Sequence, residues 1–116
     1  MVQYEERLDR TFAALADSTR RGILERLGKG DESISKLAGA FDMTLTGMKK
    51  HVGVLEEVGL VETKKVGRVR QCSLVPNRLE EVDAWIETYR QMIEARYDHL
   101  EVLLQSMKED SDGNPD

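Results

Sequence analysis

Cysteine, proline and aromatic residues are scarce in this sequence, and long apolar runs are absent. A single thiol, Cys72, excludes an intrachain disulfide and a metal site built from several cysteines. No apolar run approaches the roughly 18 residues that a transmembrane helix needs, so we expect no membrane partner. The opening residues, MVQYEERLDR, alternate acidic and basic side chains without an apolar stretch behind them. We therefore expect no signal peptide and a cytoplasmic protein.

Charge is unevenly distributed along the chain. The net charge of −5 is unfavourable at first sight for binding nucleic acid. Residues 44–71, however, hold six lysines and arginines against three glutamates, whereas residues 75–116 hold four against eleven acidic residues. Because salt screens charges beyond about 8–10 Å, a locally basic surface can bind DNA on an acidic protein.

The first part of the chain shows helical spacing of its apolar residues. That spacing predicts a first helix over 4–15. Asp17 or Ser18 is the expected N-cap of a second helix, because both side chains can accept a hydrogen bond from a free backbone N–H. Gly28 or Gly30 is expected to end that helix.

Two further short helices follow, joined by a tight turn. We place Ile34 in a short extended piece and expect Ser35 to cap a helix over 36–41. Thr44 is the expected N-cap of the next helix, over 45–57. Two short helices joined in this way are typical of a helix-turn-helix. The side chains of the second one predicted to face inward are Leu45, Met48, Val52 and Leu55.

Two strand-like runs come after the helix-turn-helix. Residues 60–66 form a strand-like run, Gly67 is a turn residue, and the side chains of residues 68–74 alternate between two faces, which predicts a β-hairpin, or wing. Cys72 shares a strand face with Leu74, so we interpret it as a buried structural thiol. The less favoured alternative is an exposed redox sensor with a low pKa.

A long last helix is predicted over 79–107, where apolar residues recur every three or four positions with one break at Arg96. At 1.5 Å per residue it would be about 43 Å long, which exceeds the roughly 30 Å diameter of a small domain. Part of its apolar face therefore needs a cover, most simply a second copy of the chain. We predict one winged-helix domain over 1–107 and a disordered tail over 108–116.

Three stretches together resemble the ArsR-type winged helix-turn-helix repressors: ADSTRRGILERL, ISKLAGAFDMTLTGMKKHVGVLEEVGLVE and KKVGRVRQCSLVP. The resemblance covers roughly residues 5–105. It implies a mainly α fold with a small β-hairpin wing and a dimer paired through the first and last helices. It also implies that the helix over 45–57 enters the major groove of DNA with the wing beside it.

The resemblance is to the subgroup without metal sites. Metal-sensing members place cysteines at the start of the third helix, where this chain has SISKLAGAF, or pair several Asp, Glu and His residues on the last helix. Here His99 is the one histidine of that helix, and a zinc site needs more nitrogen ligands. We expect no metal and no cofactor.

The candidate DNA-binding residues lie on the second helix of the helix-turn-helix and on the wing. Thr hydroxyls, Lys amines and Arg guanidinium groups can reach phosphates or base edges. The alternatives are a solvated helix face and, for Lys64 and its neighbours, protection of an edge strand. Gly47 and Lys49 depart from the family's common pattern, so no operator sequence is predicted. The predicted contacts are Ser35, Thr44, Thr46, Gly47, Lys49, Lys50, His51, Lys65, Arg68 and Arg70.

The apolar stripes of the first and last helices are the predicted homodimer interface. Trp85, Tyr89 and Tyr97 are interpreted as interface core, with a cavity for a small-molecule effector as the less favoured alternative. The predicted interface residues are Tyr4, Leu8, Phe12, Val82, Ile86, Tyr89, Ile93 and Leu100.

The sequence therefore predicts a homodimeric, sequence-specific DNA-binding regulator that represses transcription by blocking a promoter. The alternative is a winged-helix module that binds other proteins and no DNA. We predict no enzyme, because the sequence offers no nucleophile with a matching base and no phosphate-binding loop.

Overall fold

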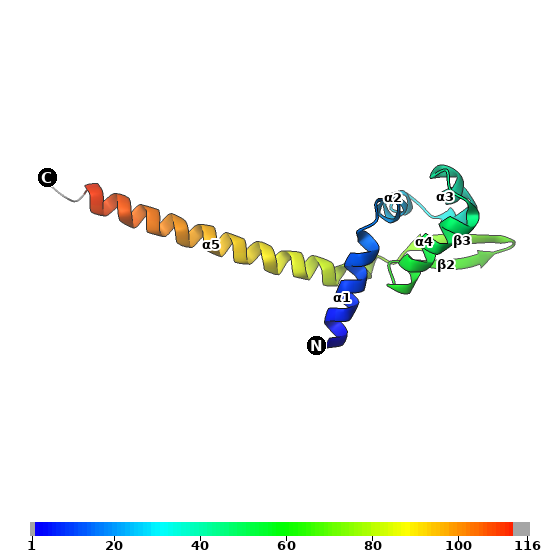
Figure 1. The fold of residues 1–116 in the computed structure, drawn as a ribbon, viewed down its shortest axis with the longest axis horizontal. Helices are drawn as coiled ribbons and strands as arrows, with labels where there is room; N and C mark the ends of the chain where they lie inside the picture. Colours follow the sequence, from blue (N-terminus) through cyan, green and yellow to red (C-terminus); the bar gives the residue numbers. More distant parts are fainter. Residues whose placement is uncertain (1, 113–116) are drawn as a thin grey trace. The chain divides into compact units, whose positions relative to one another are not determined.

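The computed structural model describes residues 2–112, with the side chains of residues 6–76 and 78–110. The chain divides into two compact units, residues 1–82 and residues 83–116. In chain order the elements are α1 (Val2–Leu15), α2 (Ser18–Leu27), β1 (Glu32–Ser33), α3 (Ile34–Ala40), α4 (Leu45–Glu57), β2 (Val61–Val66), β3 (Val69–Leu74), the 3-10 helix η1 (Pro76–Leu79) and α5 (Glu80–Asp112) (Figure 1).

Asp17 is the N-cap of α2, which confirms one of the two predicted alternatives, Asp17 and Ser18. Its carboxylate accepts a hydrogen bond from the backbone N–H of Arg20 at 3.0 Å. This bond lowers the pKa of Asp17, and the positive charge of Arg20 adds to the effect. The cap holds the start of α2 in place directly after α1.

Two arginines in the first turn of α2 bind the end of α1. Arg20 Nε donates to one terminal carbonyl of α1 at 2.8 Å, and Arg21 Nη1 donates to another at 2.8 Å. These arginines have a structural role, because their guanidinium groups tie the start of α2 to carbonyl oxygens at the end of α1. The accepting oxygens belong to Ala13, Ala14 and Leu15.

The start of α3 differs from the prediction. Ser33, and not Ser35, is the N-cap, because its hydroxyl accepts a hydrogen bond from the backbone N–H of Lys36 at 3.1 Å. Ile34 is the first helical residue and is not in an extended piece. The reason is a tertiary one: Ser33 pairs with Gln71 of β3, and this pairing ends the extended segment at Ser33.

Helix α4 has the predicted bounds, Leu45–Glu57, and the predicted N-cap, Thr44, whose hydroxyl accepts from Gly47 N at 3.0 Å. Three of the four residues predicted to face inward are buried. Leu45 is instead 43% exposed. At 100° per residue it lies at one edge of the buried stripe, so the prediction of an inward side chain was wrong there.

The sheet of the first unit is antiparallel, with strand order β1-β3-β2. Strands β2 and β3 pair from Val61↔Leu74 to Val66↔Val69 and form the predicted wing. Gly67 makes the turn with φ +65°, a conformation that glycine adopts without strain. The core lies between this sheet and helices α2, α3 and α4, and its fully buried large side chains are Ile23, Leu37, Met48, Leu55, Leu60, Val52, Val61 and Cys72.

Helix α5 extends to Asp112, beyond the predicted end at Met107. The stretch over 108–112, predicted to be disordered, is therefore helical, and residues 113–116 lie outside the described part. Lysine and glutamate favour helix here, and Gln105 donates to Glu109 at 3.4 Å one turn on. Over the described residues, no helix has the length and apolar character needed to cross a membrane.

Candidate nucleic-acid interface

The N-terminal half of α4 exposes a polar face. Thr44, Thr46, Lys49 and Lys50 are all exposed, and the N-terminus of the helix adds free backbone N–H groups and a positive dipole end. Gly47 is explained by the cap, because a Cβ there would lie 3.2 Å from the Thr44 hydroxyl oxygen. This end of α4 can therefore accept a phosphate or a base edge.

A hollow of about 330 Å³ lies between the first turns of α3 and α4 and the wing. The structure brings four predicted residues together around it, although they are distant in the sequence: Ser35, Lys49, Arg68 and Arg70. Ser35 is thus misassigned as a cap but lies in the candidate site. Three cations from two elements around one hollow make a strongly positive groove.

The wing contributes its charges along β2 and β3. Lys65 is directly opposite Arg70 in the hairpin register, and Arg68 follows Gly67 at the turn. In Figure 1 the tip of the hairpin extends beyond α3 and α4. Within the described residues, the cations of the candidate site form no ion pair, so their charges are available to a ligand; they are Lys49, Lys50, Lys65, Arg68 and Arg70.

His51 is set apart from the other predicted contacts. Its side chain is only 21% exposed. Its Nδ1 atom lies 3.3 Å from Nη1 of Arg20 and 3.8 Å from the Asp17 carboxylate. The ring therefore faces the junction of α1 and α2, and not the exposed face that carries Lys50. We assign His51 a structural contact in place of the predicted DNA contact.

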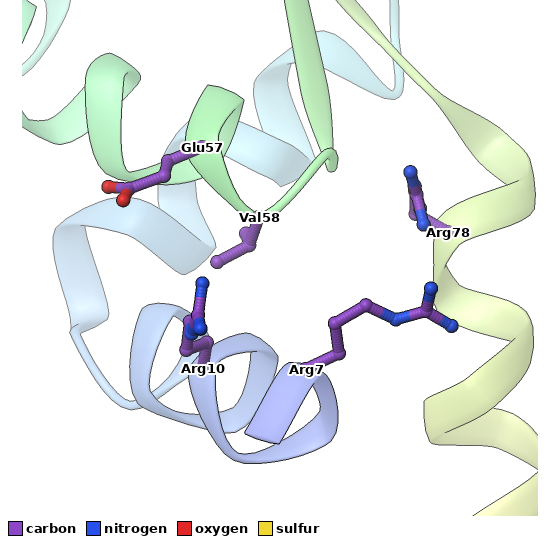
Figure 2. Close-up of a pocket in the computed structure, with 5 residues that line it drawn as sticks. All are labelled: Arg7, Arg10, Glu57, Val58 and Arg78. Carbon is purple, nitrogen blue, oxygen red and sulfur yellow. The ribbon is translucent and has the colours of Figure 1, made fainter. Parts of the chain in front are cut away.

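A second charged hollow, of about 80 Å³, lies at the other end of α4 (Figure 2). Three arginines line it, together with Val58 and Glu57, whose carboxylate points away from Arg7 and Arg78 in Figure 2. Arg7 pairs with Glu81, and Arg10 lies 3.9 Å from Glu6. Two of the three arginines thus have an acidic partner, and Glu57 adds a negative charge to the lining, so this hollow is a weaker candidate for an anion than the one beside the wing.

The predicted interface residues differ in how much surface they expose. Leu8 and Val82 are each only 7% exposed and already belong to the interior of the first unit, so they offer little surface to a partner. The side chain of Tyr4 lies outside the described ones. Phe12 and Ile93 are half-buried, and the exposed members are Ile86, Tyr89 and Leu100.

The aromatic residues of α5 lie along one side of the helix. Trp85 and Tyr89 stack with their ring centroids 5.6 Å apart and their planes 6° apart. Tyr89 and Tyr97 line a groove of about 590 Å³ that belongs to α5 alone. A groove along a single exposed helix is open to solvent until another surface covers it.

Cys72 is fully buried, as predicted. Burial, with a smaller contribution from the nearby Glu56 carboxylate, raises the pKa of its thiol to about 11. A thiol with so high a pKa holds little of the nucleophilic thiolate at neutral pH. In the described part of the chain, no group of three or more His, Cys, Asp or Glu side chains is placed to hold a metal ion.

Four residues that sequence reasoning did not assign to the site also line the hollow beside the wing: Ser33, Ile34, Leu45 and Val69. The missed signal for Leu45 is its position in the first helical turn, at the edge of the apolar stripe. No local signal marks Ser33 and Val69, because their places depend on the pairing of β1 and β2 with β3.

Comparisons with known proteins agree with this geometry. A helix-turn-helix domain family matches residues 15–64. The HTH-type transcriptional regulator YuzN of Bacillus subtilis is 39% identical over 69 residues, which are 53% of this chain and 75% of YuzN. The transcriptional repressor SdpR of the same organism is 25% identical over 79 residues, 68% of this chain and 88% of SdpR. The crystal structure of an ArsR family transcriptional regulator superposes with a TM-score of 0.74 at 42% identity, covering 81% of this chain and 97% of that one.

Proposed function

This chain belongs to the ArsR family of helix-turn-helix transcriptional regulators, and from that premise we propose that it binds specific DNA sequences as a homodimer and represses transcription. Helix α4 is the recognition helix, and the wing formed by β2 and β3 lies beside it on the DNA. Two such helices in a symmetric dimer would read half-sites about one turn of DNA apart.

One observation carries the DNA contact: three cations of α4 and the wing converge on one hollow and form no ion pair within the described residues. Lys49 comes from α4, and Arg68 and Arg70 come from the wing. Unpaired cations on two elements can bind neighbouring phosphates while the first turn of α4 faces the base edges. A module that binds only proteins has no need of this arrangement.

The homodimer is supported by the exposed apolar stripe of α5. Twelve positions of the helix at 100° per residue, from Val82 to Met107, fall within a stripe roughly 140° wide. Apart from Val82, which is buried, and Ile93, which is half-buried, its large side chains are exposed to water in the single chain, and Arg96 is the one charged residue within it. A second copy of the same helix can cover such a stripe, because in a symmetric dimer the same apolar surface of each copy packs against the other. Ile86, Tyr89, Ile93 and Leu100 are the proposed contacts.

Repression follows from where the dimer would lie. A dimer bound across two half-sites covers the promoter and excludes the polymerase, and no cofactor is required. The relative SdpR is a repressor, which supports this direction of regulation.

The test is fluorescence anisotropy with duplexes selected by the full-length protein from a random pool, measured at several salt concentrations. We expect selective binding that weakens steeply with salt, because each phosphate contact releases counterions. The double variant Lys49→Glu with Arg68→Glu should bind the selected duplex at least about 100-fold more weakly near 0.15 M salt.

A matched control makes the same charge change elsewhere. Lys29→Glu with Lys108→Glu alters two exposed lysines that do not line the hollow, and it should leave the affinity within a few fold. If the wild-type protein binds no duplex even at low salt, DNA binding is refuted and a protein-binding module becomes the better explanation.

A further inference from the structure

We infer that Leu45 contacts the 5-methyl group of a thymine in the major groove and is therefore a specificity-determining residue of α4. The inference rests on the proposed DNA binding and names one chemical feature that the recognition helix reads.

The first observation is the exposure of Leu45. In the first unit, the large apolar side chains are buried with few exceptions, and Leu45 is 43% exposed. It is the first residue of α4, directly after the N-cap Thr44. An exposed leucine at this position does not serve the core, which the buried Met48, Val52 and Leu55 of the same helix already supply.

The second observation is the position of Leu45 beside charged residues. It lines the positive hollow between α4 and the wing, together with Lys49 and Val69. Leu45 and Lys49 are four residues apart and lie one above the other on the same flank of α4. A lysine that binds a phosphate or a guanine would therefore bring the leucine into the same groove.

The chemistry of the groove then limits what Leu45 can bind. A leucine side chain has no hydrogen-bonding group, so it leaves the donors and acceptors of guanine, cytosine and adenine unpaired. The one apolar group on the major-groove edge of a base pair is the 5-methyl of thymine. Contact between the two removes apolar surface from water on both sides.

The experiment removes that methyl group and nothing else. A duplex selected by the wild-type protein is resynthesised with deoxyuridine in place of each thymine in turn, and affinity is measured by anisotropy. At one thymine per half-site, we expect the wild-type protein to bind about fourfold more weakly per lost methyl. Leu45→Ala should bind the thymine and deoxyuridine duplexes equally.

The control variant is Val102→Ala, which shortens an exposed apolar side chain on α5, 66% exposed and outside the stripe proposed for the dimer. It should keep the full preference for thymine. Thermal unfolding of Leu45→Ala should stay close to that of the wild type, because Leu45 is not part of the buried core.

The outcomes separate this inference from the proposed function. If the wild-type protein selects a sequence but no thymine methyl matters, or if Leu45→Ala shows the same methyl dependence, the inference is overturned and DNA binding stands. If the wild-type protein selects no sequence at all, sequence-specific binding and the inference fail together.

Discussion

The two units of this chain treat their apolar side chains in opposite ways. In residues 1–82 most large apolar residues are buried in one core. Of the exposed ones, Leu45 and Val69 line the candidate DNA site, whereas Val66 and Leu79 do not. In the described part of the second unit, by contrast, Leu100, Leu103 and Met107 are each about half exposed or more. The first unit has the core of a folded domain, whereas the second exposes the apolar stripe that we propose as a dimer interface.

Polar contacts show the same difference. In the first unit they join separate elements, as when Arg26 of α2 donates two hydrogen bonds, of 2.8 and 3.0 Å, to Glu32 of β1. In the second unit, by contrast, Arg90 donates to Glu87 of the same helix at 2.6 Å. Contacts within a helix stabilise that helix, but they do not fix its position against another element.

The largest expected effect comes from a substitution that disrupts the apolar stripe of the second unit. Leu100→Asp places a charge in the middle of the apolar stripe, and burying it in a dimer is prohibitive. We expect a monomer at micromolar concentration by sedimentation velocity. We also expect a loss of at least about 100-fold in DNA affinity, because two half-sites are no longer bound by one molecule.

Val102→Asp is the matched control, since Val102 lies on the other side of α5 from the stripe. It should remain dimeric. If Leu100→Asp is as dimeric as the wild type, the assignment of the stripe to self-association is wrong.

An intermediate effect is expected when one leucine of each unit is replaced by alanine and the stabilities of the two variants are compared. Leu55→Ala removes a fully buried side chain, so the free energy of unfolding should fall by about 2–5 kcal/mol at any protein concentration. Leu100→Ala should lower stability in a way that depends on concentration, because its side chain is buried only between copies. Thermal unfolding over a hundredfold concentration range distinguishes them, and the same concentration dependence in both variants would contradict the division.

The smallest expected effect concerns the polar junction in the first unit. The folded-state pKa of Asp17 is lowered, so its negative charge stabilises the fold above the unfolded-state value near about 3.9, and the benefit disappears as pH falls through the folded pKa. Asp17→Asn keeps a capping side chain without the charge. We expect it to be less stable than the wild type at pH 7, with a difference that closes below about pH 4. Unfolding measured from pH 7 down to pH 3 checks this, and a difference that stays constant would show that charge plays no part.

Sequence signals were sufficient where a few neighbouring residues decide the structure. Thr44 and Asp17 carry their own capping groups, and Gly67 alone permits the turn of the wing, so α4, α2 and the hairpin were predicted at or near their observed positions. The choice between Ser33 and Ser35 as a cap could not be made locally. It is decided by the pairing of Ser33 with Gln71, which is far along the chain.

The candidate site was predicted in its composition but not in the orientation of its side chains. Lys49, Arg68 and Arg70 lie together as residues of a helix-turn-helix and its wing should. His51 and Leu45 occupy the two edges of the buried stripe of α4, where helical periodicity alone does not say which way a side chain turns. The packing of α1 and α2 against α4 turns His51 inward, and the hollow beside the wing leaves Leu45 in solvent.

The side chain of Arg20 connects the end of α1 to the middle of α4. One guanidinium group holds the last carbonyls of α1 and lies 3.3 Å from His51 in the middle of α4. A displacement of α1 would therefore be transmitted to the recognition helix through a single side chain. A molecule that binds at α1 would have a short route to change how the protein reads DNA, without touching the DNA itself.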